Sequence, residues 1–177
     1  MKTKFFIAII TFATLVACSS DDSQTGLQKS EQEIAVENLI SKCQDFDAER
    51  IIQGLPGEWV IELAFYYDED WQKIIKCIYD GKYGLLCSRI FNLDGTAEGF
   101  WAWSTDMKNG ETAHYNWSYD AESKEIITVN VEGKPYHMKV LGFNGEHLVL
   151  DCIIKEVSHT KEESFNCRQI FRRKTEE

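Results

Sequence analysis

From Trp59 onward, apolar and polar residues alternate along the chain with a period of two. Such alternation is typical of a β-strand with one buried face. In the first strand the shared apolar face comprises Trp59, Ile61, Leu63, Phe65 and Tyr67, with Glu62 and Asp68 on the other face. The pattern predicts eight strands, near 58–67, 85–92, 97–104, 113–119, 125–131, 135–142, 147–154 and 165–172. The segment WQKIIKC, residues 71–77, is either an extra strand or a long loop.

The segments between these strands carry the residues of tight turns. They include Asp80-Gly81, Asp94-Gly95, Asn109-Gly110, Glu132-Gly133 and Asn144-Gly145, and such pairs supply the positive backbone angles of β-hairpins. Short hairpin-linked strands are typical of an up-and-down antiparallel barrel or of a sandwich. The barrel is favoured, because sequential hairpins need no long crossover and closure removes exposed edges.

Helical periodicity is confined to residues before the first strand. Ser30 to Glu33 has the spacing of a capping box, which predicts a helix over 31–42. A second short turn runs from Asp47 to Gly54. The expected fold is therefore all-β, an eight-stranded up-and-down barrel with an N-terminal helix.

The first thirty residues do not belong to this fold. Two lysines and a short apolar run precede Leu15-Val16-Ala17-Cys18, a pattern typical of a secretory signal peptide. The ending resembles the lipobox of bacterial lipoproteins, which implies cleavage before Cys18 and lipid attachment to its sulfur. The alternatives are an ordinary signal peptide that leaves Cys18 as a thiol and an uncleaved signal anchor.

The expected division of the chain follows from this pattern. It comprises a signal peptide over 1–17, a lipidated tether over 18–30, a helical segment over 31–53 and a barrel over 54–177. The leader holds two of the 19 basic residues and none of the 29 acidic ones, so the remaining chain has a net charge of −12. That charge argues against nucleic acid or an anionic lipid surface as partner. Membrane contact would come through the N-terminal lipid.

Several motifs resemble those of the lipocalin-like lipoproteins of the Bacteroidota. They are the Gly57-Glu58-Trp59 entry to the first strand, the sequence FNLDGT and an arginine-rich last strand, and the resemblance covers 47–173. It implies a barrel that holds a small apolar molecule, closed at one end by Trp59 beneath Arg168 or Arg172. The acidic pair Asp21-Asp22 resembles the export signal of surface lipoproteins in that group, which favours the cell surface over the periplasmic face of the outer membrane.

Aromatic residues are dense on the faces expected to point into the barrel. As ligand-binding walls we expect Trp101, Trp103, Tyr115, Trp117, Tyr119 and Tyr136. The alternative is that these rings simply fill the core. The helix 31–42 and the loop 67–72 are candidates for the rim of the barrel.

Five cysteines remain after Cys18. Cys152 and Cys167 fall on the last two predicted strands and form the first candidate disulfide, and Cys77 with Cys87 forms a second. Reduced, buried thiols are the alternative. There is no C-x-x-C spacing, so no metal or other cofactor is expected.

No motif of catalysis is present in the sequence. There is neither a G-x-S-x-G nor a Walker A pattern, and the four histidines fit surface positions. The stretch NLDGTAEG, with Asp94 and Glu98, reads as a hairpin turn rather than a calcium loop. The expected function is non-catalytic binding of a small apolar or amphipathic molecule in the barrel. The alternative is a filled barrel that binds a protein or glycan through its loops.

Overall fold

The computed structural model describes residues 31–71, 74–79, 86–102, 110–157 and 162–175. Two helices come first, α1 (Glu31–Cys43) and α2 (Ala48–Gly54). Nine strands follow: β1 (Gly57–Tyr67), β2 (Ile74–Tyr79), β3 (Leu86–Phe91), β4 (Thr96–Ala102), β5 (Gly110–Asp120), β6 (Glu125–Asn130), β7 (Pro135–Phe143), β8 (His147–Val157) and β9 (Glu162–Arg173). The expected lipid attachment residue Cys18 and the expected wall residue Trp103 lie outside the described residues.

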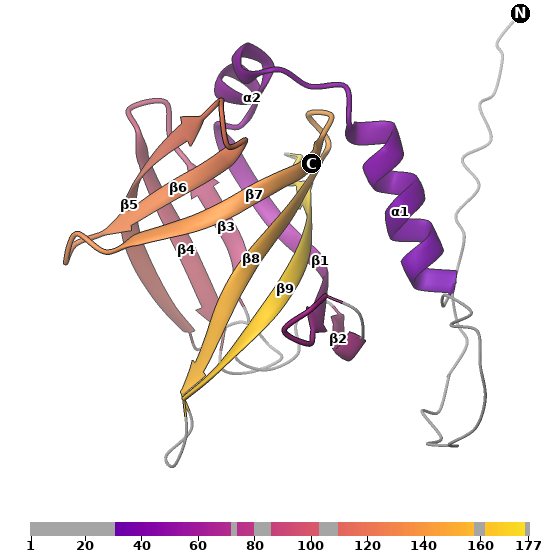
Figure 1. The fold of residues 1–177 in the computed structure, drawn as a ribbon. Coiled ribbons are helices and arrows are strands. Elements are labelled where there is room, and N and C mark those ends of the chain that lie inside the picture. The colour runs from indigo at the N-terminus through magenta and orange to yellow at the C-terminus, as the bar shows by residue number, and fades with distance from the viewer. Residues whose placement is uncertain (1–30, 72–73, 80–85, 103–109, 158–161, 176–177) are drawn as a thin grey trace, which may run out of the picture.

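Eight of the strands form a closed antiparallel barrel (Figure 1). Neighbours along the chain pair in the order β3 to β9, and β1 pairs with both β3 and β9, which closes the ring. The predicted eight-stranded up-and-down barrel with an N-terminal helix is therefore confirmed.

The segment after β1 contains the ninth strand. β2 pairs with the second half of β1, over Leu63 to Tyr67, whereas β3 pairs with its first half, over Gly57 to Val60. β2 and β3 thus follow one another along the same edge of β1. Of the two alternatives for residues 71–77, the extra strand is correct for Ile74 to Cys77.

A β-bulge changes which side chains of β1 point inward. Opposite β9, Ile61 pairs with Phe171 and Leu63 pairs with Ile170, so Glu62 is the extra residue. The expectation that Trp59, Ile61, Leu63, Phe65 and Tyr67 share one face is wrong after Ile61. Ala64 and Tyr66 belong to the barrel core, and Phe65 and Tyr67 to a separate outer cluster.

Helix α1 covers this outer cluster. Its residue Val36 is buried there against β1, β8 and β9, with Leu39 and Ile40 packed beside it. Gly142 of β7 allows the close approach, because a Cβ at this position would lie 2.9 Å from the Cβ of Cys43. The helix therefore packs on the outside of the barrel wall (Figure 1). Among the described residues, no helix has the length and hydropathy needed to cross a membrane.

Helix α2 begins with a side-chain cap and lies at the end of the barrel where β1 starts. Asp47 Oδ1 accepts a hydrogen bond from the backbone N–H of Arg50 at 2.8 Å. The buried residues Ile51 and Leu55 join the barrel core. Figure 1 shows α2 over this end of the barrel, which we call the closed end.

Candidate functional site: the barrel interior

Trp59 and Arg173 seal the closed end. The Trp59 side chain is fully buried, and its indole Nε1 donates to the carbonyl of Leu55 at 2.8 Å. The guanidinium carbon of Arg173 lies 4.5 Å from the centre of the Trp59 ring, a cation–π distance. The same guanidinium donates to the carbonyls of Pro56, Gly145 and Gly54. It therefore ties three parts of the closed end together.

The arginine over Trp59 is thus neither of the two that were expected. Arg168 faces outward and makes a bidentate ion pair with Asp151, at 2.7 and 2.8 Å. Arg172 is also outward and pairs with Glu62 at 2.9 Å. Phe171 points inward, and a strand alternates its faces, so Arg173 and not its neighbours reaches the interior.

The interior has a densely packed side formed by β1, β7, β8 and β9. Most of its inward side chains are almost completely buried, whereas Tyr136, Ile154 and Phe165 are only partly buried. This packed side consists of Ile61, Ala64, Tyr66, Met138, Val140, Phe143, Leu148, Leu150, Cys152, Cys167 and Phe171. Nothing beyond core packing is required to explain these residues.

The aromatic residues of β4 and β5 form a different wall, which we call the aromatic side. Trp101, Tyr115, Trp117 and Tyr119 pack against the core cluster, yet each keeps intermediate exposure. The rings of Trp101 and Tyr115 lie 6.4 Å apart. Tyr136 of β7, another expected wall residue, also faces inward and is intermediate in exposure.

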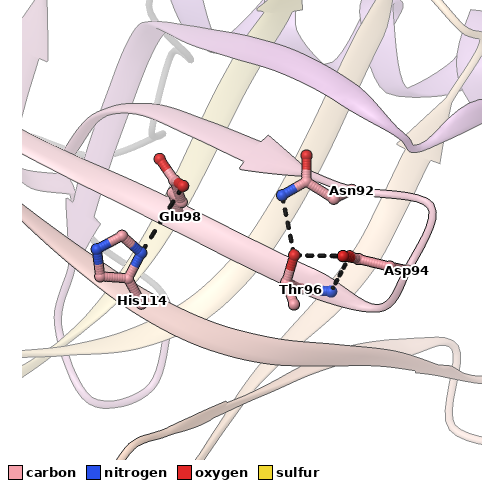
Figure 2. A network of polar contacts seen from close by, with 5 residues as sticks. All are labelled: Asn92, Asp94, Thr96, Glu98 and His114. Atoms are coloured by element: carbon pink, nitrogen blue, oxygen red, sulfur yellow. Dashed lines mark hydrogen bonds and ion pairs between the residues drawn. The ribbon is translucent and has the colours of Figure 1, made fainter.

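Trp117 has a structural explanation of its own. Its indole Nε1 donates to the carbonyl of Asn92 at 2.9 Å, and its ring packs edge-on against Phe91. The β3–β4 turn is itself closed by side chains, because Asp94 Oδ1 accepts from both the N–H and the hydroxyl of Thr96 (Figure 2). Trp117 is therefore locked to the closed end, and the turn needs no calcium ion.

Three buried polar residues on inward positions were not anticipated from the sequence. Arg89 of β3, Thr128 of β6 and Gln169 of β9 are only 6%, 1% and 1% exposed. The signal was available, because each lies two residues from an inward apolar residue: Phe91, Ile126 and Phe171, respectively.

Arg89 influences the ionisation of the tyrosines around it. Burial raises the pKa of Tyr136 and of Tyr115, and the positive charge of Arg89 opposes this rise at both hydroxyls. Both phenols therefore remain protonated at neutral pH and can donate hydrogen bonds.

The cysteines expected to form a disulfide are directly opposite one another but are not bonded. Cys152 pairs with Cys167 in the β8–β9 register, and both carry thiols. The Sγ of Cys152 lies 3.6 Å from the carbonyl oxygen of Cys167, so it donates to backbone instead of joining the opposite sulfur. The structure corrects that pairing. The side chains of Cys77 and Cys87 lie outside the described residues, and Cys43 carries a buried thiol.

A groove of about 730 Å³ lies outside the barrel, between α1 and the outer faces of β7, β8 and β9. Tyr67 and Trp71 line it with ring centres 5.2 Å apart, and the guanidinium of Arg168 lies 5.6 and 5.8 Å from these rings. Glu33 and Glu37 of α1 add acidic groups to the lining. The rim elements expected from the sequence, helix 31–42 and loop 67–72, therefore meet at this external groove.

The described histidines face outward from the barrel, with His114 and His137 exposed and His147 largely buried beside Glu62 at 3.9 Å. His114 faces Glu98 at 3.7 Å (Figure 2), and His137 faces Glu125 at 2.9 Å. Within the described part of the chain, no cluster of three or more His, Cys, Asp or Glu side chains has the arrangement of a metal site.

No protein-family model matches the chain, and no curated protein matches it. Among solved structures, bovine odorant-binding protein in complex with undecanal is 14% identical, with a TM-score of 0.42 over 75% of this chain and 79% of that one. A deswapped triple mutant of the bovine odorant-binding protein is 12% identical, with a TM-score of 0.39 over 70% and 76% of the two chains. Similarity at this level says nothing about a ligand of this chain.

Proposed function

We propose that the protein binds a small apolar or amphipathic molecule inside the barrel, without catalysis. The observation that carries the proposal is the difference between the two sides of the interior. Side chains that point into a closed barrel are expected to be buried, as most are on the packed side, where Ile154 and Phe165 are exceptions. Trp101 and Tyr115 point inward and still keep part of their surface exposed. Inward aromatic surface that the protein itself leaves uncovered suits contact with an apolar molecule.

The test is binding of the neutral fluorescent probe N-phenyl-1-naphthylamine. Ala113 is a small inward residue of β5, two positions before Tyr115, and Thr112 is its exposed neighbour. An Ala113→Trp variant should cover this inward aromatic surface and weaken probe binding by about tenfold or more, since it removes roughly 1.4 kcal/mol or more. A Thr112→Trp variant should bind as the wild type does. Equal binding by both variants, or none by the wild type, would refute the proposal.

A second measurement looks for the natural ligand. Native mass spectrometry of protein purified from its own host should show an added mass that organic solvent removes. A protein that carries no added mass and also fails to bind the neutral probe would favour the second candidate.

That second candidate is recognition of a carbohydrate at the external groove. Arg168, held by Asp151, fixes the Tyr67 and Trp71 rings beside acidic side chains, and aromatic faces next to polar groups suit a sugar ring. A Trp71→Ala variant should lose binding on a glycan array and keep N-phenyl-1-naphthylamine binding. The opposite result would exclude the groove as the site.

The cellular location is part of the proposal. The lipobox-like Leu15-Val16-Ala17-Cys18, the small polar stretch after it and Asp21-Asp22 support a lipid-anchored protein of the outer membrane that faces the cell surface. Radioactive palmitate should label the wild-type protein and not a Cys18→Ala variant. Label in that variant would refute the anchor. Protease added to intact cells should degrade a surface-exposed domain and spare a periplasmic one.

A further inference from the structure

Arg89 crosses the interior of the barrel. It extends from β3, and the ring order places β7 on the opposite side of the barrel. Its guanidinium carbon nevertheless lies 5.9 Å from the centre of the Tyr136 ring of β7 and 6.0 Å from that of Phe171 of β9. The positive charge is therefore held well inside the barrel, between two aromatic faces.

Among the residues that the structure describes, this charge has no carboxylate partner of the kind that burial normally demands. The Arg89 Nε is buried and has no hydrogen-bond partner, and no carboxylate of the described residues lies within ion-pair distance of the guanidinium. A buried guanidinium with an unsatisfied N–H costs free energy unless something pairs with it. The aromatic faces of Tyr136 and Phe171 offset only part of that cost.

Two further unsatisfied polar groups border the same region. Thr128 Oγ1 is buried without a partner, and Thr128 is directly opposite Tyr136 in the β6–β7 register. Gln169 Oε1 is likewise buried without a partner, and Gln169 lies two residues from Phe171 on the same face of β9. The two rings that contact Arg89 therefore adjoin Thr128 and Gln169. The Thr128 hydroxyl can donate to an anion, whereas the Gln169 Oε1 is an acceptor.

We propose that the interior binds the anionic head group of an amphipathic ligand, a monocarboxylate, with Arg89 as its charge partner and Thr128 as an additional donor. This inference rests on the proposed function and adds the chemical class of the ligand. The carboxylate accepts from the guanidinium, a charge-assisted hydrogen bond of the strong kind. The apolar part of the ligand lies along Tyr115 and Trp101, further along the aromatic side.

The electrostatics of the interior select an anion over a cation. Glu111 is the acidic residue on the inward face of β5, but it is exposed and lies opposite Trp101 in the β4–β5 register, away from the closed end. Arg89 lies opposite Trp59 in the β1–β3 register, near the closed end. A cationic head group at that depth would meet the unpaired Arg89 charge. The chain as a whole is negatively charged, so its net charge does not attract an anion. We therefore attribute anion binding to Arg89 inside the barrel.

The test compares ligands that differ only in their head group. The full chain is titrated with dodecanoate and with dodecan-1-ol in competition with N-phenyl-1-naphthylamine. Dodecanoate should bind about tenfold or more tightly than the alcohol, because hydrogen bonds to charged groups are worth roughly one to two powers of ten in affinity. Equal affinity of the two ligands in the wild type would overturn the inference and leave the proposed function intact. Failure of both ligands and of the probe would overturn the proposed function itself.

Variants then assign the effect to its residues. Arg89→Met should abolish the preference for dodecanoate and keep probe binding, and Arg172→Gln, which removes an outward arginine, should keep the preference. Thr128→Val preserves the side-chain shape and should lower the preference for dodecanoate by a few fold. This variant tests the inference independently if Arg89→Met does not fold. A preference that persists in Arg89→Met, or that Thr128→Val leaves unchanged, would overturn the assignment.

Discussion

Arg173 links segments at the closed end that are far apart in the sequence. It stacks on Trp59 and donates hydrogen bonds to the carbonyls of Gly54, Pro56 and Gly145. An Arg173→Met variant keeps a long side chain but leaves these carbonyls without their donor. We expect the free energy of unfolding, measured by urea denaturation, to fall by about 2–4 kcal/mol.

The matched control for this prediction is the neighbouring Arg172. Its side chain is 61% exposed and pairs with Glu62 at the surface. Arg172→Met should therefore change stability by about 1 kcal/mol or less. Similar losses in the two variants would contradict the special role of Arg173.

The thiols are a second feature at the scale of single residues. Cys43, Cys152 and Cys167 are buried and carry thiols, and burial raises the pKa of Cys43. Because all three side chains are shielded from solvent, these cysteines should react slowly with a maleimide in the native protein and rapidly in urea. Mass spectrometry after alkylation without reductant should find all three residues modified. A crosslinked peptide joining Cys152 and Cys167 would show the prediction to be wrong.

How far the sequence predicts individual residues depends on the alternation along each strand. The sequence correctly indicates Trp59 as the tryptophan of the closed end, but not the arginine that stacks on it. Counting by two from the inward Phe171 leads to Arg173 and excludes Arg172. The same count would have identified Arg89 as an inward residue two positions before Phe91. When only the apolar residues of a strand are used to define its inward face, a polar residue on that face, such as Arg89, is wrongly assigned to the outside of the barrel.

At the scale of elements, helix α1 depends on its contact with the outside of the barrel. Val36 is 6% exposed within the cluster formed with Phe65, Tyr67 and Val149, whereas Ile34 on the same helix is 47% exposed. Val36→Ser should destabilise the packed helix by roughly 1–3 kcal/mol, because it removes buried apolar surface and places a hydroxyl there. Native-state hydrogen exchange should show faster exchange of the α1 amides.

The control for α1 is Ile34→Ser, which alters an exposed residue of the same helix and should change exchange little. Equal effects of the two substitutions would mean that helix propensity, and not packing, holds α1 in place. The capping box and apolar spacing predicted where α1 lies in the sequence. They did not predict what it covers, because that surface exists only after the bulge at Glu62 turns Phe65 and Tyr67 outward. An extra residue in a strand leaves no mark on the alternation by which strands are identified.

At the scale of the whole molecule, the closed ring encloses apolar side chains together with one buried positive charge. The Arg89 guanidinium lies between Tyr136 of β7 and Phe171 of β9, and the nearby phenols of Tyr115 and Tyr136 remain protonated. The eight-stranded barrel could be predicted from the alternation along the strands together with the hairpin turns that link them. The contacts of Arg89 across the interior could not, since they depend on which strands face each other across the ring.

The ionisation of the partly buried tyrosines predicts how stability depends on pH. Burial raises the pKa of Tyr67, Tyr115, Tyr119 and Tyr136 above the ordinary value of 10.0. Their contribution is therefore fully present below pH 10.0. It is lost above it, because the unfolded chain then releases protons that the folded chain retains. Each such tyrosine reduces the free energy of unfolding by at most about 1.4 kcal/mol per pH unit. Urea denaturation at several pH values from neutral to alkaline should show this decline.

Tyr136→Phe is the variant that isolates one of these groups. Tyr136 faces the barrel interior next to Arg89 and Cys152, and burial raises the pKa of its phenol, so it should keep its proton in the folded state at pH values where the unfolded chain has lost it. The variant has no phenol to ionise on unfolding, so its stability should decline less steeply above pH 10.0, by up to about 1.4 kcal/mol per pH unit. Below pH 10.0 the free energies of unfolding of the wild type and of Tyr136→Phe should change with pH in the same way, because every tyrosine is protonated in both the folded and the unfolded state. Parallel decline above pH 10.0 as well would mean that Tyr136 ionises as readily in the barrel as in the unfolded chain, and therefore that the interior around Arg89 is open to water.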